Sequence, residues 1–244
     1  MAINIIKIKQ IIIFTLSIFL LPSTAFAGNL TLKSFGHSSF LIKGENKKIL
    51  LNPFKAIGCA TNLDEPKGVN VDFILASSKL ADEGYNPNGN LMFVEPGIYK
   101  FQDTLLNGIL VPHDRLGGRR FGMATVWSWE QNNFKIVHMG GAAGQLDMNS
   151  QIVLSRPDIL FISIGGGIKS YDGEEASRIV KTLKPKIVIP VHFASKKRIN
   201  EDCDFSNADL FLENMKDFKV KYVGNSLQIT PKKVEENTIY IFNY

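Results

Sequence analysis

A strand–helix–strand pattern in the second half of the chain limits the possible folds more than any other feature. The apolar run Ile159–Ile164 predicts a buried strand, which ends at three consecutive glycines. Asp172 can cap a following helix, whose apolar residues recur at helical spacing up to Leu183. Pro185 ends this helix, and Ile187–Val191 predicts the next buried strand. Such a unit requires a sheet with a helix packed on one face.

The rest of the chain consists mainly of short strand-like runs. Apolar residues predict strands at 30–35, 40–42, 49–51, 71–76, 91–94, 106–111, 123–129, 134–139, 220–223 and 227–229, with turns at 44–46 and 131–133. Ser206, with Asp209 three residues later, indicates a capping box for a second helix. The chain has no low-complexity linker and no convincing internal repeat. We therefore expect one mixed α/β or α+β domain.

The first 27 residues have the pattern of a secretory signal peptide. Lys7 and Lys9 precede the apolar run Ile11–Leu21, and an Ala-Phe-Ala sequence ends at Ala27. The apolar run is shorter than a membrane span requires. We expect residues 28–244 to be exported to the periplasm or secreted, with a membrane contacted only through an uncleaved N-terminal segment.

Charge and cysteine content narrow the class of protein further. The net charge is +5, and removal of the two signal-peptide lysines lowers it to +3. Scattered charge of this size argues against a nucleic-acid partner. Cys59 and Cys203 are the only cysteines, so at most one disulfide can form, and the sequence leaves their pairing open.

The chain contains four histidines, all outside the predicted helices: His37, His113, His138 and His192. The last three lie at or just after strand-like runs. A single histidine at a strand end more often has a structural role, whereas four at comparable positions favour a clustered site.

Several segments, in order, resemble the metallo-β-lactamase fold, and in particular the L-ascorbate-6-phosphate lactonase-like branch of its zinc-dependent hydrolases. The segments are Gly36-His37-Ser38-Ser39-Phe40, Ile49-Leu50-Leu51-Asn52-Pro53, Val71-Asp72-Phe73-Ile74-Leu75, Val137-His138-Met139-Gly140-Gly141 and the stretch from Tyr171 to Phe193. The resemblance implies a single αββα sandwich with its site at one edge. It also implies two metal ions, held by H-x-H-x-D-H, a later His, a bridging Asp and a final His, that activate a hydroxide for attack on a carbonyl or phosphoryl centre.

The chain departs from this family pattern at several ligand positions. The replacements are Ser78 and Leu80 for the two leading histidines, Glu83 for the histidine after the aspartate, Gly141 for the bridging aspartate, and Asn52 for an aspartate that supports the metal-site histidines. Asp82, His138 and His192 keep the family's residue types. One imidazole cannot hold a zinc ion, so we expect the first metal site to be empty.

Two hypotheses about function follow from the resemblance and its departures. The first is a non-catalytic or strongly diverged member that binds a small anionic molecule, with His37, His113, Arg119 and Arg120 lining the pocket, because guanidinium groups bind carboxylate or phosphate. The alternative is a mononuclear hydrolase of an ester, lactone or phosphoester. It would hold one Zn, Mn or Fe ion on Asp82, Glu83 and His192, with His138 nearby. Neither hypothesis identifies a catalytic residue.

Structural explanations exist for the same residues. Asp82 followed by Glu83 has the pattern of a helix N-terminus, with the aspartate as cap. Arg119 and Arg120, after two glycines, are compatible with a solvated basic hairpin. A nucleophilic Ser78 is disfavoured because the sequence places no base beside it.

Overall fold

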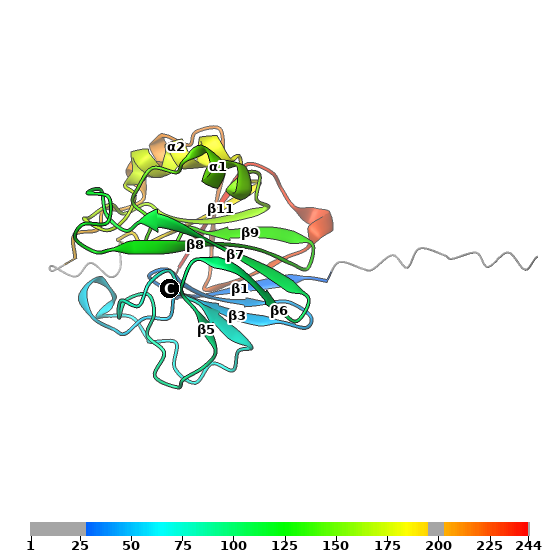
Figure 1. The fold of residues 1–244 in the computed structure, drawn as a ribbon. Coiled ribbons are helices and arrows are strands. Elements are labelled where there is room, and N and C mark those ends of the chain that lie inside the picture. Colours follow the sequence, from blue (N-terminus) through cyan, green and yellow to red (C-terminus); the bar gives the residue numbers. More distant parts are fainter. Residues whose placement is uncertain (1–27, 195–202, 244) are drawn as a thin grey trace, which may run out of the picture.

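The computed structural model describes residues 28–194 and 203–243, so the predicted signal peptide lies outside the described residues. Two mixed β-sheets pack face to face, and helices cover the outer face of the larger sheet (Figure 1). The predicted single-domain αββα sandwich is confirmed. Within the described residues, no helix is long and apolar enough to cross a membrane.

The smaller sheet has six strands in the order β13-β1-β2-β3-β4-β5. Its strands are β1 (Leu30–Gly36), β2 (Ser39–Lys43), β3 (Lys48–Leu51), β4 (Phe73–Leu75), β5 (Met92–Phe93) and β13 (Ser226–Ile229). Strands β1, β2, β3 and β13 pair antiparallel, whereas β3, β4 and β5 pair in parallel. Loops lie on the outer side of this sheet (Figure 1), and the short 3-10 helix Gly58–Ala60 follows β3.

The larger sheet has eight strands in the order β12-β14-β11-β10-β9-β8-β7-β6. They are β6 (Gly97–Phe101), β7 (Thr104–Pro112), β8 (Met123–Gln131), β9 (Phe134–His138), β10 (Ile159–Ser163), β11 (Ile187–Val191), β12 (Lys219–Val223) and β14 (Thr238–Phe242). The five strands from β12 to β9 run parallel, and β8, β7 and β6 add antiparallel hairpins. Carboxyl ends of parallel strands meet at one edge, where ligands bind in such sheets.

Apolar side chains fill the space between the sheets and the space beneath the helices. Trp127 of β8 is fully buried between the sheets, and its indole N–H donates to the Ala76 carbonyl at 2.8 Å. This bond fixes the end of β4 against the larger sheet. The residues that directly follow Ala76 belong to the candidate site.

Helix α2 (Gly173–Leu183) confirms the helix of the strand–helix–strand pattern. The Asp172 carboxylate accepts the Glu175 N–H, and the Glu175 carboxylate accepts the Asp172 N–H, which completes a capping box. Lys184 ends the helix in the left-handed region, at φ 52°. The structure also contains α1 (Met148–Leu154), β6 and β14, which the sequence analysis does not predict.

The predicted cap of the last helix is wrong. Helix α3 (Asp209–Glu213) begins at Asp209, and the Asn207 side-chain oxygen accepts the Asp209 N–H at 3.0 Å. Ser206 lies before the helix because its N–H donates to Gly165 O and its carbonyl accepts the Ala194 N–H. Gln131, predicted in a turn, is the last residue of β8.

Candidate functional site

All four histidines lie on loops or strand ends at one edge of the sandwich. His37 lies in the β1–β2 turn, His113 follows β7, His138 ends β9 and His192 follows β11. Each side chain is at least 95% buried. Their contacts differ: His113 contacts Glu83, His37 contacts His192, and His138 contacts Ser38.

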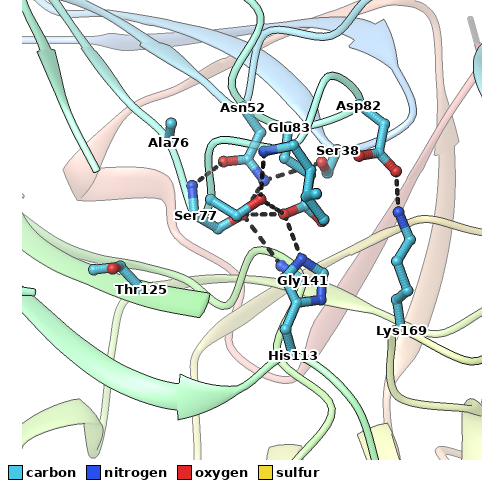
Figure 2. A network of polar contacts seen from close by, with 12 residues as sticks. Ser38, Asn52, Ala76, Ser77, Asp82, Glu83, His113, Thr125, Gly141 and Lys169 are labelled. Carbon is cyan, nitrogen blue, oxygen red and sulfur yellow. Dashed lines mark hydrogen bonds and ion pairs between the residues drawn. The ribbon is translucent and has the colours of Figure 1, made fainter. Parts of the chain in front are cut away.

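A buried hydrogen-bond network surrounds Glu83 (Figure 2). Its Oε2 accepts the Ser77 hydroxyl at 2.7 Å and the Ser78 hydroxyl at 2.9 Å. The His113 Nε2 lies 2.9 Å from the same oxygen. Asn52 orders the network from the other side: its Nδ2 donates to the Ser77 hydroxyl, and its Oδ1 accepts the Ser77 N–H, both at 2.8 Å.

Glu83 and His113 form an ionised pair. Burial opposes the charge on Glu83, but the nearby His113 charge and its hydrogen bond hold the pKa of this carboxyl well below its usual range. Burial also opposes the charge on His113, but the Glu83 carboxylate raises the pKa of the imidazole. The pair therefore places one carboxylate and one imidazolium, with no net charge, inside the site.

His37 and His192 form a second group, which is uncharged. Both residues have positive φ angles, 55° and 50°, and the His192 N–H donates to the His37 carbonyl at 3.0 Å. Their ring centroids lie 4.0 Å apart. Burial lowers the pKa of His37 to about 4 and the pKa of His192 well below its ordinary value, so both imidazoles are neutral near pH 7. Within the described residues, His37 Nε2 and both His192 nitrogens have no hydrogen-bond partner.

His138 and Asp82 contact other groups. The His138 Nε2 lies 3.2 Å from the Ser38 carbonyl, and burial lowers the pKa of His138 to about 4, so the neutral ring donates this hydrogen bond. Asp82 forms an ion pair with Lys169. Residues 81–83 form turns rather than a helix, so the helix-cap interpretation of Asp82 is wrong. The Leu80 carbonyl accepts the N–H of both Glu83 and Gly84, which closes the chain into a tight turn.

The loop between β7 and β8, which begins at His113, carries basic side chains. The buried Asp114 carboxylate accepts four backbone N–H groups, from Leu116, Gly118, Arg120 and Phe121. These bonds, that of Phe121 first, lower the pKa of Asp114 to about 2. The Arg120 guanidinium lies 5.2 Å and the Lys169 ammonium 5.7 Å from the centre of the Phe121 ring. Arg119 is exposed on the same loop.

The residues present do not fit a two-metal centre in this arrangement. The Ser78 hydroxyl donates to Glu83, and Leu80 offers no donor atom, so neither residue completes the first metal position that the resemblance implies. A Cβ on Gly141 would lie 2.3 Å from His113 Cε1 and 2.4 Å from Glu83 Oε1. The Glu83–His113 pair therefore fills the space that a bridging aspartate would need. Across the described ranges, no three His, Cys, Asp or Glu side chains are grouped so that they could hold a metal ion.

Three contributors to the site were missed in the sequence. Lys169 follows the triple glycine and carries no local signal. Ser77 precedes the position of the family's first histidine, and only the structure shows its contact with Glu83. Phe205 stacks on His37 with ring centroids 5.7 Å apart and lies 5.3 Å from His192. Its closeness to Cys203 is the one signal that could have indicated a fixed position.

The sequence of the chain is similar to a known domain family and to several proteins that share one name. The model of the beta-lactamase superfamily domain matches residues 31–192. A UPF0173 metal-dependent hydrolase from Carboxydothermus hydrogenoformans is 25% identical over 191 residues, which are 65% of this chain and 82% of the relative. A relative of the same name from Roseiflexus castenholzii is 27% identical over 117 residues, and the match spans 45% of each chain.

A solved structure supports the same fold. A Thermotoga maritima protein, assigned to the Zn-dependent hydrolases of the metallo-beta-lactamase superfamily, has a TM-score of 0.68 and 22% identity, and the match covers 87% of this chain and 98% of that one. The chain therefore belongs to the metallo-β-lactamase superfamily. Within it, its relatives are the UPF0173 metal-dependent hydrolases.

Proposed function

We propose that this protein is an exported, strongly diverged member of the superfamily that binds a small anion at this edge of the sandwich without a two-metal centre. The observation that carries the proposal is the Glu83–His113 pair, which lies where the side chain of a bridging aspartate would begin. The pair is ionised, buried and bonded to two serine hydroxyls. These contacts connect the loops that follow β4 and β7.

The basic groups around Phe121 support an anionic ligand. Arg120 and Lys169 reach the same aromatic ring from different loops, and His113 lies 6.5 Å from it between ring centroids. Guanidinium and ammonium groups bind carboxylate and phosphate oxygens through charge-assisted hydrogen bonds. Arg119 and Arg120 remain the predicted anion ligands in this proposal, and Lys169 joins them.

Three finer points belong to the same proposal. The motifs quoted above support the lactonase-like branch, and the replacements at Ser78, Leu80, Glu83 and Gly141 support the loss of most metal ligands. A disulfide between Cys59 and Cys203 supports export, because disulfides persist in oxidising compartments. The ligand is a small molecule rather than a nucleic acid.

A mononuclear metal site on Asp82, Glu83 and His192 is the second candidate. Glu83 Oε1 and both His192 nitrogens are buried without a hydrogen-bond partner in the described part of the chain, which favours this candidate. The ion pair between Asp82 and Lys169 and the three groups bonded to Glu83 Oε2 oppose it.

Metal content separates the two candidates. Purified protein is exposed to Zn²⁺, Mn²⁺ or Fe²⁺, freed of unbound ions by gel filtration and analysed for bound metal. We expect no stoichiometric ion, and the same result for Asp82→Ala and His192→Ala. One tightly bound ion per chain, lost in Asp82→Ala, would instead support the mononuclear hydrolase and justify assays with esters, lactones and phosphoesters.

Anion binding tests the proposal directly. Inorganic phosphate is titrated into the protein and followed by calorimetry. We expect Arg120→Ala to weaken binding several-fold. Arg178→Ala is the matched control, because it removes the same charge from the exposed side of α2, where Arg178 pairs with Glu174. Absence of binding, or equal affinities for the two variants, would contradict the proposal.

A further inference from the structure

The imidazoles of His37 and His192 lie against each other, with ring centroids 4.0 Å apart, and are called the two-histidine subsite below. Positive φ angles at both residues are costly for a non-glycine residue, so the surrounding structure must hold them in place. Their nitrogens are buried and, among the described residues, His37 Nε2 and both His192 nitrogens lack a hydrogen-bond partner. Ring nitrogens of imidazole form hydrogen bonds with hydroxyl and carbonyl groups, so the subsite suits such a group of a ligand.

An aromatic ring covers this subsite. Phe205 stacks on His37 at an interplanar angle of 22° and contacts the His192 ring at a tilt of 39°. Phe54 approaches His37 edge-on, with ring centroids 5.8 Å apart. Phe54 is fully buried, whereas Phe205 is partly exposed. Phe205 is therefore the aromatic neighbour that lies between the imidazoles and solvent.

The position of Phe205 is fixed from both sides. Two residues before it, Cys203 is bonded to Cys59, which lies 144 positions away in the loop after β3. One residue after it, the Ser206 backbone is hydrogen-bonded to Gly165 and Ala194, beside β10 and β11. The disulfide thus connects a loop of the smaller sheet to the segment that covers the histidines.

We propose that Phe205 is a cover of the two-histidine subsite that controls access to its imidazoles, and that the Cys59–Cys203 disulfide holds it there. This inference rests on the proposed function, since the subsite adjoins the anion site and would recognise an uncharged part of the same ligand. A ligand with such a group reaches the imidazoles by displacing Phe205. The disulfide limits how far the segment at 203–206 can move away.

Acylation of histidine nitrogens by diethyl pyrocarbonate tests this cover without any ligand. The full protein is labelled at pH 7, and modification of each histidine is measured by peptide mass spectrometry. We expect His37 and His192 to react slowly in the wild-type protein and several-fold faster in Phe205→Ala. His138, which lies on β9 and contacts Ser38, is the internal reference and keeps its rate. Phe218→Ala, which removes a half-buried ring from the helix side of the larger sheet, is the matched control and leaves all rates unchanged.

The contribution of the disulfide is measured in the same way. Reduction with a dithiol, which becomes a disulfide while Cys59 and Cys203 become thiols, is expected to raise the rates of His37 and His192 and leave His138 unchanged. The double variant Cys59→Ser with Cys203→Ser should reproduce this result.

Unchanged rates in Phe205→Ala would overturn the cover, and unchanged rates after reduction would overturn the role of the disulfide. An equal rise at His138 would also overturn the proposal, because it would indicate general loosening. Failure of phosphate to bind would contradict the proposed function alone.

Discussion

At residue 141, a single added carbon atom would meet the Glu83–His113 pair at 2.3–2.4 Å, so glycine is required while the pair is in place. We expect Gly141→Ala to lower the free energy of unfolding by about 1–3 kcal/mol, as overpacking does. Gly141→Asp should lower it further, because a second carboxylate would face Glu83. Urea unfolding measures both. Gly224→Ala, where no atom lies within 4 Å of the added carbon, is the control. Equal stability of the residue-141 variants and wild type would mean that the pair moves aside.

The Glu83–His113 pair also predicts strong coupling between its members. Removing one partner of a buried ion pair leaves the other charge uncompensated, so Glu83→Gln should cost about 3–5 kcal/mol of stability. The double variant Glu83→Gln with His113→Gln should cost clearly less than the sum of the single variants. The exposed pair Lys79–Glu95 is the control, and Glu95→Gln should change stability by at most about 1 kcal/mol. Additive effects at Glu83 and His113 would contradict an interacting pair.

The sequence predicts the members of the site better than their contacts. Histidines at strand ends are visible in the chain, because each lies at or next to an apolar run that predicts its strand. The sequence does not reveal which group each of these side chains contacts. Glu83 contacts His113, which is thirty positions away, and Asp82 contacts Lys169, which is eighty-seven positions away. The four proposed metal ligands contact different groups: Asp82 contacts Lys169, Glu83 contacts His113, His138 contacts Ser38 and His192 contacts His37.

At the scale of elements, Asp114 organises the loop that carries Arg120 and Phe121. Its two carboxylate oxygens accept four backbone N–H groups. Asp114→Asn keeps one acceptor oxygen, so two of these N–H groups lose their partner and the loop no longer fixes the positions of Arg120 and Phe121. We expect phosphate affinity to fall several-fold, with less effect on global unfolding. Calorimetry and thermal unfolding measure the two effects, with Asp217→Asn as the control for an exposed aspartate. Unchanged affinity would remove this loop from the binding site.

Local signals explain which elements were predictable. Helix α2 was predictable, because the capping pair Asp172 and Glu175 lies at its own N-terminus. Helix α1 was not predictable, since its apolar residues Met148, Ile152 and Val153 are exposed and only Leu154 is buried. In β6, Ile98 is 75% exposed, so this strand also lacks a buried apolar pattern. Strand β14 depends on pairing between β11 and β12, which the order of the chain does not reveal.

At the scale of the molecule, the Cys59–Cys203 disulfide joins segments separated by 144 positions, and it forms a link that the sequence left open. A crosslink over so long a loop restricts the unfolded chain strongly. Cys59→Ser with Cys203→Ser should therefore lower the free energy of unfolding by about 2–5 kcal/mol. Urea unfolding with and without a dithiol measures this effect, and the double variant should no longer respond to the dithiol. A wild-type protein whose stability is indifferent to reduction would contradict the prediction.

The pH dependence of stability depends on all the titratable groups of the site. His37 and His138 have a folded pKa of about 4 because of burial, and burial also lowers the pKa of His192. The unfolded histidines titrate near pH 6.5. Below that pH the unfolded chain binds protons that the folded chain does not, so stability falls with acidification by up to about 1.4 kcal/mol per histidine and pH unit.

His113 changes stability with pH in the opposite direction. Although burial opposes its charge, Glu83 raises its pKa, so its stabilisation is complete below about pH 6.5 and is lost as the pH rises through the folded value. The lowered pKa of Glu83 adds stability above about pH 4.5 that is lost in stronger acid. We therefore expect stability to rise steeply with pH up to about pH 6.5, and to decline more gradually in alkaline solution, where His113 loses the proton that its folded state holds. Urea midpoints at pH 5, 6.5 and 8 measure the profile. His138→Gln should make the acid side less steep, and a wild-type profile that is flat from pH 6.5 to 5 would mean that these imidazoles are hydrated rather than buried.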